Sequence, residues 1–253
     1  MQKSNKILIA DEIHEFAINE LNSLGFELAY FPDIPEHEIK DKREKAIQRA
    51  ILGLVGKSLI CPSAETILGE SSQYCKKTIY WIDMELPVVF SSNSRRTCID
   101  LLGISGGQPV VCELKFVNND SRYRSNCPIY AAMELLNYHL YIVANQEKLN
   151  KGNIRHEFVE IRPEDIGSGI WANYDKNNPI LLVAANIGYW KKWTDISLES
   201  FKKLSDIVGV SIMPYSFDDI SFCKKDGKEL YKEDDVHCPG LRHKEVSVWS
   251  LID

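Results

Sequence analysis

The turn sequence Ser105-Gly106-Gly107-Gln108 constrains the fold of this chain more than any other stretch. Two apolar runs that are rich in β-branched residues flank it, over residues 97–104 and 109–116. A short glycine turn between two such runs is typical of a β-hairpin. We therefore predict a pair of antiparallel strands within residues 95–116.

The register of this hairpin brings charged side chains together. If the two glycines form the turn, Asp100 lies opposite Glu113 in a non-hydrogen-bonded pair, where side chains approach most closely. Pro109 then falls where the ladder needs no N–H group. Lys115 lies two residues beyond Glu113 and points to the same face of the strand. The hairpin thus predicts one patch with two carboxylates and an ammonium group.

Two carboxylates that face each other at roughly 5 Å repel, and a cation between them removes the conflict. Mg²⁺ in proteins is usually held by one or two carboxylates, with waters and phosphate oxygens completing its shell. A lysine beside such an ion can hold the attacking water or the transition-state oxygens. We therefore expect a Mg²⁺ site, with Mn²⁺ as an alternative ion, that serves phosphodiester hydrolysis.

The pattern D-x12-E-x-K across a hairpin, followed by a helix, resembles the PD-(D/E)XK nuclease superfamily. The downstream stretch Glu134-Leu135-Leu136-Asn137-Tyr138 is similar to the QxxxY helix motif of RecB-type members, with Glu in place of Gln. Ile99 stands where the motif has Pro. The resemblance covers about residues 44–145. It implies that Asp100 and Glu113 bind the metal, that Lys115 orients water, and that Glu134 and Tyr138 support them.

The resemblance also implies a fold. We expect an α/β protein with a mixed central sheet and flanking helices, restriction-endonuclease-like, that cleaves nucleic acid, with DNA as the expected substrate. Two other interpretations stay open. Glu-x-Lys on a strand is also a common exposed, cross-strand pattern. A non-catalytic module on the same fold would bind nucleic acid or a protein partner through the same groove. The pattern leaves endonuclease and exonuclease action, DNA and RNA, and the oligomeric state open.

The charge of the chain opposes nucleic-acid binding through a global basic field. The 253 residues carry a formal net charge of -6, whereas nucleic-acid binders usually show a basic surface. A local groove is still compatible with this charge. Its candidate residues, which can equally be solvated surface, are Arg95, Arg96, Arg122 and Arg124.

The N-terminal segment predicts a small βαβ-type unit over residues 1–40, followed by a nuclease-like α/β domain over 41–253. Strand-like runs at 6–10 and 26–31 flank a helical pattern at 13–24. This segment is similar to the start of D-2-hydroxyacid dehydrogenases, but only over about 35 residues. No GxGxxG motif follows to seat a dinucleotide, so we interpret the segment as a generic unit or an appendage.

The remaining patterns predict helices at 43–59, from Pro128 and at 198–208, and strands at 78–82, 86–90, 158–161, 180–185 and 210–213. Glu44 lies where nucleases of the resembled superfamily often carry a Glu on the helix before the hairpin, but we favour its interpretation as a first-turn residue that the helix dipole stabilises. The sequence Tyr189-Trp190-Lys191-Lys192-Trp193 predicts either a base-stacking patch or an amphipathic rim, and we favour the rim.

The seven cysteines are scattered and form no CxxC motif, which predicts reduced thiols. Cys223, His237, Cys238 and His243 lack the paired short spacings of structural zinc sites. No signal peptide and no 18-residue apolar segment is apparent. We therefore expect a cytoplasmic protein with no membrane association.

Overall fold

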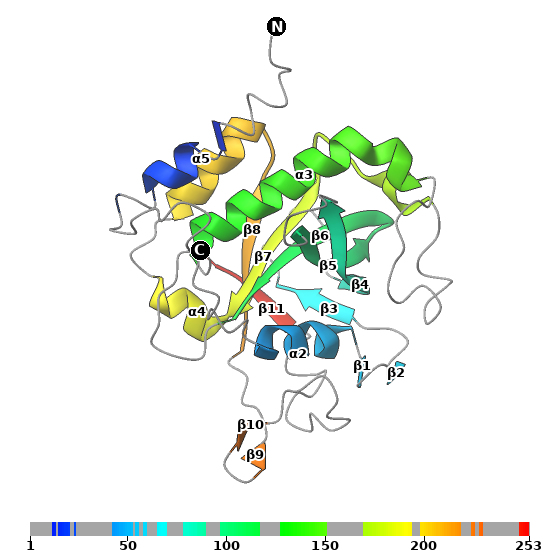
Figure 1. The fold of residues 1–253 in the computed structure, drawn as a ribbon, viewed down its shortest axis with the longest axis vertical. Helices are drawn as coiled ribbons and strands as arrows, with labels where there is room; N and C mark the ends of the chain where they lie inside the picture. The colour runs from blue at the N-terminus through cyan, green and yellow to red at the C-terminus, as the bar shows by residue number, and fades with distance from the viewer. Residues whose placement is uncertain are drawn as a thin grey trace, which may run out of the picture.

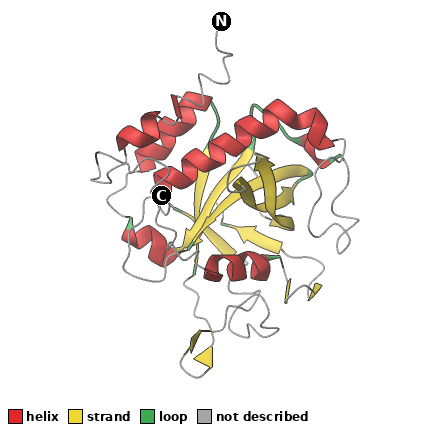
Figure 2. Cartoon of the chain, in the orientation of Figure 1, coloured by secondary structure: helices red, strands yellow, loops and turns green. Residues whose placement is uncertain are grey.

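The computed structural model describes a barrel of strands with helices packed against its outer face (Figures 1 and 2). The residues that it describes are 12–13, 15–20, 23, 42–52, 54–55, 58–59, 65–69, 78–89, 97–116, 127–150, 169–193, 198–218, 224–225, 228–229 and 248–252.

Seven strands form the closed barrel, and each is hydrogen-bonded to the next in the order β11, β3, β4, β5, β6, β7, β8 and back to β11. Three pairs, β11 with β3, β6 with β7, and β7 with β8, are parallel, and the others are antiparallel. The strands are β3 (Glu65–Leu68), β4 (Thr78–Val89), β5 (Thr97–Ser105), β6 (Gln108–Lys115), β7 (Ile180–Asn186), β8 (Ile212–Phe217) and β11 (Val248–Leu251).

The expected open, restriction-endonuclease-like sheet is therefore wrong. The sheet is mixed, as expected, but β11 pairs with β3 on one side and with β8 on the other and closes it into a ring. Closure satisfies the backbone groups that two exposed edge strands would leave unpaired. The strand that makes this closure has only four residues, and the sequence analysis did not identify it.

The predicted hairpin is confirmed as β5 and β6. Its register runs from Ser105 opposite Gln108 to Leu101 opposite Cys112, as the glycine turn predicts. Gly106 and Gly107 have φ values of 59° and 87°. Positive φ at both central positions is the signature of a type I′ turn, and glycine adopts it without a steric penalty.

The barrel interior is filled by one cluster of apolar side chains. Trp249 of β11 contacts Trp81 of β4 and Phe217 of β8, with ring centroids 5.4 Å and 6.0 Å apart. Trp81 also donates a hydrogen bond of 2.7 Å from Nε1 to Oγ1 of Thr66. Helix α2 (Lys42–Ile51) adds Ile47 to the same cluster.

A second apolar cluster joins the outer face of the barrel to the helices. Helix α3 (Pro128–Asn150) lies along this face, and α5 (Leu198–Val208) and the helical residues 15–20 lie beside it (Figure 1). Ile13 and Ala17 are buried in this cluster. The rest of the predicted 1–40 unit lies largely outside the described residues, so the division into two domains stays a prediction.

Other elements differ locally from the sequence analysis. The helix predicted over 43–59 ends at Ile51, and the short antiparallel strands β1 (Leu54–Val55) and β2 (Ser58–Leu59) follow. Gly53 and Gly56 weaken helix continuation there, at about 1 kcal/mol each. The two strands predicted at 78–82 and 86–90 are one strand, β4, with register shifts between Trp81 and Asp83 and again before Val89.

The helices predicted from Pro128 and over 198–208 and the strand over 180–185 are confirmed, and the strand predicted over 210–213 is β8. A 3-10 turn, η2 (Ile170–Asn173), precedes β7, and α4 (Ile187–Lys192) follows it. The pair β9 (Lys224–Lys225) and β10 (Lys228–Glu229) forms a small hairpin. The strand predicted over 158–161 lies outside the described residues. Among the described helices, none is both long enough and apolar enough to cross a membrane.

Candidate functional site

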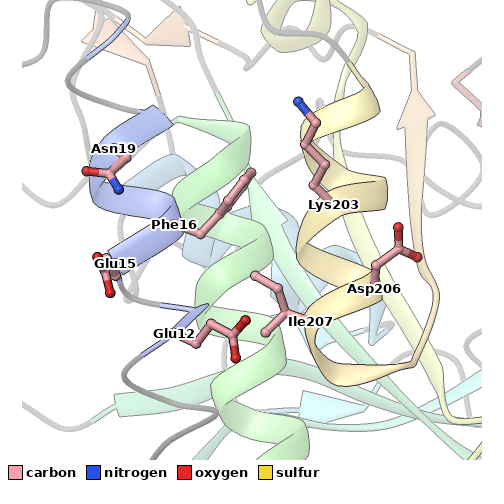
Figure 3. A pocket seen from close by; sticks show the side chains of 7 residues that line it. All are labelled: Glu12, Glu15, Phe16, Asn19, Lys203, Asp206 and Ile207. Atoms are coloured by element: carbon pink, nitrogen blue, oxygen red, sulfur yellow. The ribbon is translucent and has the colours of Figure 1, made fainter.

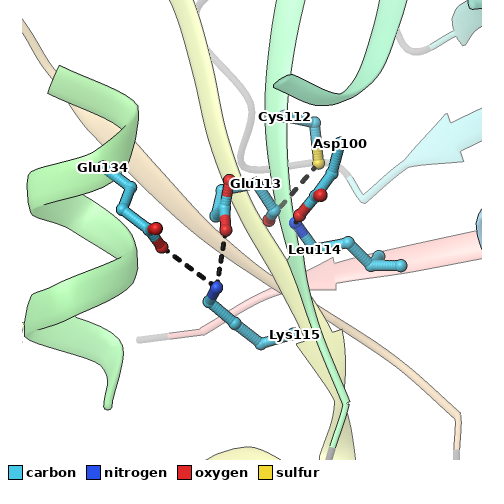
Figure 4. Close-up of polar contacts among 6 residues, drawn as sticks. All are labelled: Asp100, Cys112, Glu113, Leu114, Lys115 and Glu134. Carbon is cyan, nitrogen blue, oxygen red and sulfur yellow. Dashed lines mark hydrogen bonds and ion pairs between the residues drawn. The ribbon is translucent and has the colours of Figure 1, made fainter. Parts of the chain in front are cut away.

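The predicted charged residues meet where the β5–β6 hairpin faces helix α3. Leu102 and Val111 pair across the two strands, and both pack in the cluster that α3 covers. Side chains alternate between the faces of a strand, so Glu113 and Lys115 point toward α3 as well. Figure 4 shows Glu134 reaching from α3 toward these two side chains.

Lys115 is the centre of the cluster. Its Nζ atom donates to Oε1 of Glu113 at 2.6 Å and to Oε2 of Glu134 at 3.1 Å (Figure 4). Lys115 is only 7% exposed and Glu113 only 3%. The predicted convergence of Glu113, Lys115 and Glu134 is therefore present in the structure.

Asp100 takes part through the backbone of the neighbouring strand. The paired ladder of β5 and β6 ends at Leu101 and Cys112, one step before the predicted pair of Asp100 with Glu113. The Oδ2 atom of Asp100 instead accepts a hydrogen bond of 2.8 Å from the backbone N–H of Leu114. This bond holds the Asp100 carboxylate beside the cluster.

The surroundings of Asp100 and Glu113 disfavour the charged form of both carboxyl groups. Burial, opposed by Lys115, raises the pKa of Asp100 to about 6. Burial and the negative charge of Asp100 raise the pKa of Glu113 well above its usual range. The Oε2 atom of Glu113 is buried and has no hydrogen-bond partner among the described residues. A buried acceptor in this state costs about 1–3 kcal/mol, which a bound cation would offset.

The Lys115 ammonium group stays protonated. Burial alone would lower its pKa, but the negative charges of Glu113, Glu134, Glu44 and Asp100 together raise it well above its ordinary value. A lysine in this state donates hydrogen bonds and cannot act as a general base. Glu44, in the first turn of α2, thus acts electrostatically on the cluster as well as lying at a helix start.

Tyr138 lies one turn after Glu134 on α3, as predicted, and is buried. Burial, followed by the charges of Glu113, Glu134 and Asp100, raises its pKa well above the ordinary value. Its hydroxyl therefore stays protonated. Cys112 is buried as well, and the same two causes, burial and the carboxylates, raise the pKa of its thiol, so it is a poor nucleophile.

Two predicted sets of residues lie outside the described residues. One is the candidate nucleic-acid groove, Arg95, Arg96, Arg122 and Arg124, and the other is the zinc alternative with all four of its residues. The tryptophans around Lys191 and Lys192 are described, and they do not form a base-stacking patch. Trp193 is buried, and Nε1 of Trp190 donates to the backbone oxygen of Tyr215 at 3.0 Å. Tyr189 of the same segment is fully buried, which the sequence pattern did not indicate.

The donor set of the cluster fits a hard divalent cation. Within the part of the chain that the structure describes, no group of three or more His, Cys, Asp or Glu side chains has the arrangement of a metal site. Asp100 and Glu113 supply carboxylate oxygens alone, and two carboxylates are enough protein ligands for Mg²⁺ in sites that act on phosphates.

A separate open groove lies between the helical residues 12–13 and 15–20 on one side and α5 on the other, and none of its lining residues belongs to the cluster (Figure 3). Its charged side chains are Glu12 and Glu15 on one wall and Lys203 and Asp206, both on α5, on the other (Figure 3). Comparison with known proteins identified no matching family model, no matching curated protein and no matching solved structure. The arrangement of the charged cluster therefore carries the functional argument alone.

Proposed function

We propose that this protein is a Mg²⁺-dependent nuclease, with Mn²⁺ as an alternative ion, and that it hydrolyses phosphodiester bonds in DNA. One observation carries the proposal: a buried carboxylate oxygen, Oε2 of Glu113, has no hydrogen-bond partner among the described residues. It belongs to a cluster in which a second carboxylate and a protonated lysine are also held. The closed barrel differs from the fold expected for the PD-(D/E)XK superfamily. The support for this chemistry therefore comes from the cluster and not from the fold.

The roles follow from the contacts. Asp100 and Glu113 would hold the metal ion, which when bound supplies Lewis acidity toward the phosphoryl group and lowers the pKa of water. Lys115 is protonated, and the N–H that Glu113 and Glu134 leave free can donate a hydrogen bond to the attacking water or to a phosphoryl oxygen. Glu134 fixes the Lys115 ammonium group from α3 at 3.1 Å. Tyr138 keeps its proton and contributes a neutral hydroxyl next to the charges.

A second candidate function is a non-catalytic module that binds nucleic acid or a protein partner. The ion pairs of Lys115 favour it, because the ammonium group is already balanced by two carboxylates. In this second interpretation the cluster carries out no chemistry and only holds α3 on the barrel.

A cleavage assay separates the two candidates. The protein is incubated with labelled single- and double-stranded DNA and RNA in Mg²⁺, Mn²⁺ or EDTA. We expect metal-dependent cleavage of DNA that falls at least about 100-fold in Asp100→Asn and in Glu113→Gln. Glu199→Gln is the matched control, because Glu199 is an exposed carboxylate on α5, and it should cleave as the wild type does.

The outcomes are distinct. Cleavage that survives both substitutions would refute the assignment of the metal ligands. No cleavage with any metal, together with unchanged nucleic-acid binding in the variants, would favour the binding module. Thermal melting of each variant shows whether a loss reflects chemistry or unfolding.

A further inference from the structure

Tyr189 lies at the same end of the barrel as Lys115. Strands β6 and β7 are parallel, and Lys115, the last residue of β6, lies beside Ala185 of β7. Helix α4 begins two residues after Ala185 and carries Tyr189 in its first turn. The parallel register thus brings a tyrosine from outside the hairpin to the end of the strand that carries Lys115.

The Tyr189 side chain is fully buried, and its hydroxyl has no hydrogen-bond partner among the described residues. Its ring packs edge-on against Trp190, with centroids 5.2 Å apart, and near Trp193 at 6.5 Å. Trp190 is in turn tied to the backbone oxygen of Tyr215. The packing fixes the position of the hydroxyl, and a buried hydroxyl without a partner costs free energy that a bound molecule can recover.

The charges of the candidate site act on this hydroxyl. Burial is the main cause that raises the pKa of Tyr189 well above its ordinary value. Among the neighbouring groups, Cys127 raises this pKa and Lys115 lowers it, and Glu113 and Glu44 raise it by smaller amounts. Lys115 also has one N–H donor that the described residues leave unused. An ammonium group has three N–H donors, and two of those of Lys115 are used by Glu113 and Glu134. The third has no acceptor among the described residues.

We propose that Tyr189 is a further positioning residue of this site, and that its hydroxyl and the third N–H of Lys115 bind one shared water molecule, the water that attacks the phosphodiester. Buried waters usually bind polar groups that otherwise lack hydrogen-bond partners, which is the state of the Tyr189 hydroxyl and of the third N–H of Lys115 among the described residues. Full burial of Tyr189 favours a water over a bulky phosphate group.

This inference rests on the proposed nuclease function. In the reaction the water oxygen forms a bond to phosphorus, and the bond from phosphorus to the leaving sugar oxygen breaks with its electron pair. The proton that the water loses reaches the leaving oxygen through solvent. Tyr189 and Lys115 orient the water, and neither forms or breaks a covalent bond.

The test compares Tyr189→Phe with Tyr215→Phe in the full-length protein. Tyr215 is a fully buried tyrosine as well, but it lies in the barrel interior on β8. We expect Tyr189→Phe to lower kcat at least about tenfold, with KM within twofold and a melting temperature no lower than that of the wild type. Tyr215→Phe should leave kcat within twofold. An equal fall in both variants, or no fall in Tyr189→Phe, overturns the inference. A rise in KM with unchanged kcat also overturns it, because the hydroxyl would then bind substrate.

A second readout does not depend on activity. A crystal structure of the metal-free wild type should show an ordered water within about 3.2 Å of both Tyr189 Oη and Lys115 Nζ, and this water should be lost in Tyr189→Phe. If the wild type cleaves and no such water is present, the inference fails and the nuclease function stands. If the wild type cleaves no substrate, the proposed function and the positioning role fail together, whether or not the water is seen.

Discussion

Replacing Lys115 with methionine should destabilise the protein strongly and in a pH-dependent way. Methionine keeps most of the apolar stem of lysine but removes the ammonium group that neutralises Glu113 and Glu134. The pair with Glu113 is 2.6 Å long, and its side chains are 9% and 4% exposed. Breaking a buried pair from one side costs about 3–5 kcal/mol, because the remaining charge is left uncompensated. The pair with Glu134 is more exposed and adds less.

Protonation of Glu113 limits this cost at low pH. Its pKa is already raised well above the ordinary value while Lys115 opposes the shift, so removing Lys115 raises it further. A carboxyl group whose pKa is higher in the folded state contributes stability below its unfolded pKa and loses it as pH rises through the folded pKa. We therefore expect Lys115→Met to lose about 3–5 kcal/mol at pH 8 and only about 1–2 kcal/mol at pH 5, where mainly hydrogen bonds are lost.

Urea denaturation followed by circular dichroism at the two pH values measures these free energies. Lys203→Met is the matched control, because Lys203 makes an exposed pair with Glu199 at 3.7 Å. It should change the free energy of unfolding by no more than about 0.5 kcal/mol at either pH. A loss below about 1 kcal/mol in Lys115→Met at pH 8, or the same loss at both pH values, would refute the reasoning.

Three further outcomes are expected. The pKa of Asp100 near 6 means that protons compete with a cation, so Mn²⁺ affinity measured by calorimetry should fall as pH drops below about 6; equal affinity at pH 5 and pH 8 would contradict this. Burial lowers the pKa of His139 to about 4, so below pH 6.5 the imidazole takes up a proton in the unfolded chain before it does so in the folded protein. The free energy of unfolding of the wild type should therefore fall by about 3 kcal/mol by pH 4, relative to that of His139→Asn. Parallel curves of stability against pH for the two proteins would contradict this. Gly103→Ala would place a Cβ 2.6 Å from Cγ2 of Ile79 and should cost about 1–3 kcal/mol in urea denaturation, whereas Gly169→Ala, with open space around it, should stay within about 0.5 kcal/mol.

The parts of the fold that local chemistry dictates could be predicted from the sequence. The hairpin follows from Gly106 and Gly107, because only residues that tolerate positive φ make this turn readily. The placement of Lys115 beside Glu113 follows from the period of two along a strand. The approach of Glu134 depends on α3 packing on the same face of the hairpin, and only the resemblance to the QxxxY helix motif indicated it.

The barrel could not be predicted in the same way, because its closure is a non-local event. β11 and β3 have four residues each and are separated by most of the chain, yet Val248 pairs with Ile67 to close the ring. Neither run is long enough to show a period, and a strand pattern does not name its partner. Tyr189 was missed for a related reason, since its place near Lys115 depends on the parallel pairing of β6 with β7.

The position of the charged cluster argues that it is retained for more than stability. It lies at the edge of a large apolar cluster that joins the hairpin to α3. Replacing a buried ion pair with apolar side chains of similar volume is often neutral or stabilising, so folding alone gives no strong reason to keep Glu113 and Lys115 there. The raised pKa values of Asp100 and Glu113 show that two carboxyl groups are held in a state that disfavours their charge. Strongly perturbed groups of this kind are more frequent at functional sites than elsewhere. A bound cation would stabilise the charged form of both groups, and this links the energetic cost of the cluster to the chemistry proposed for it.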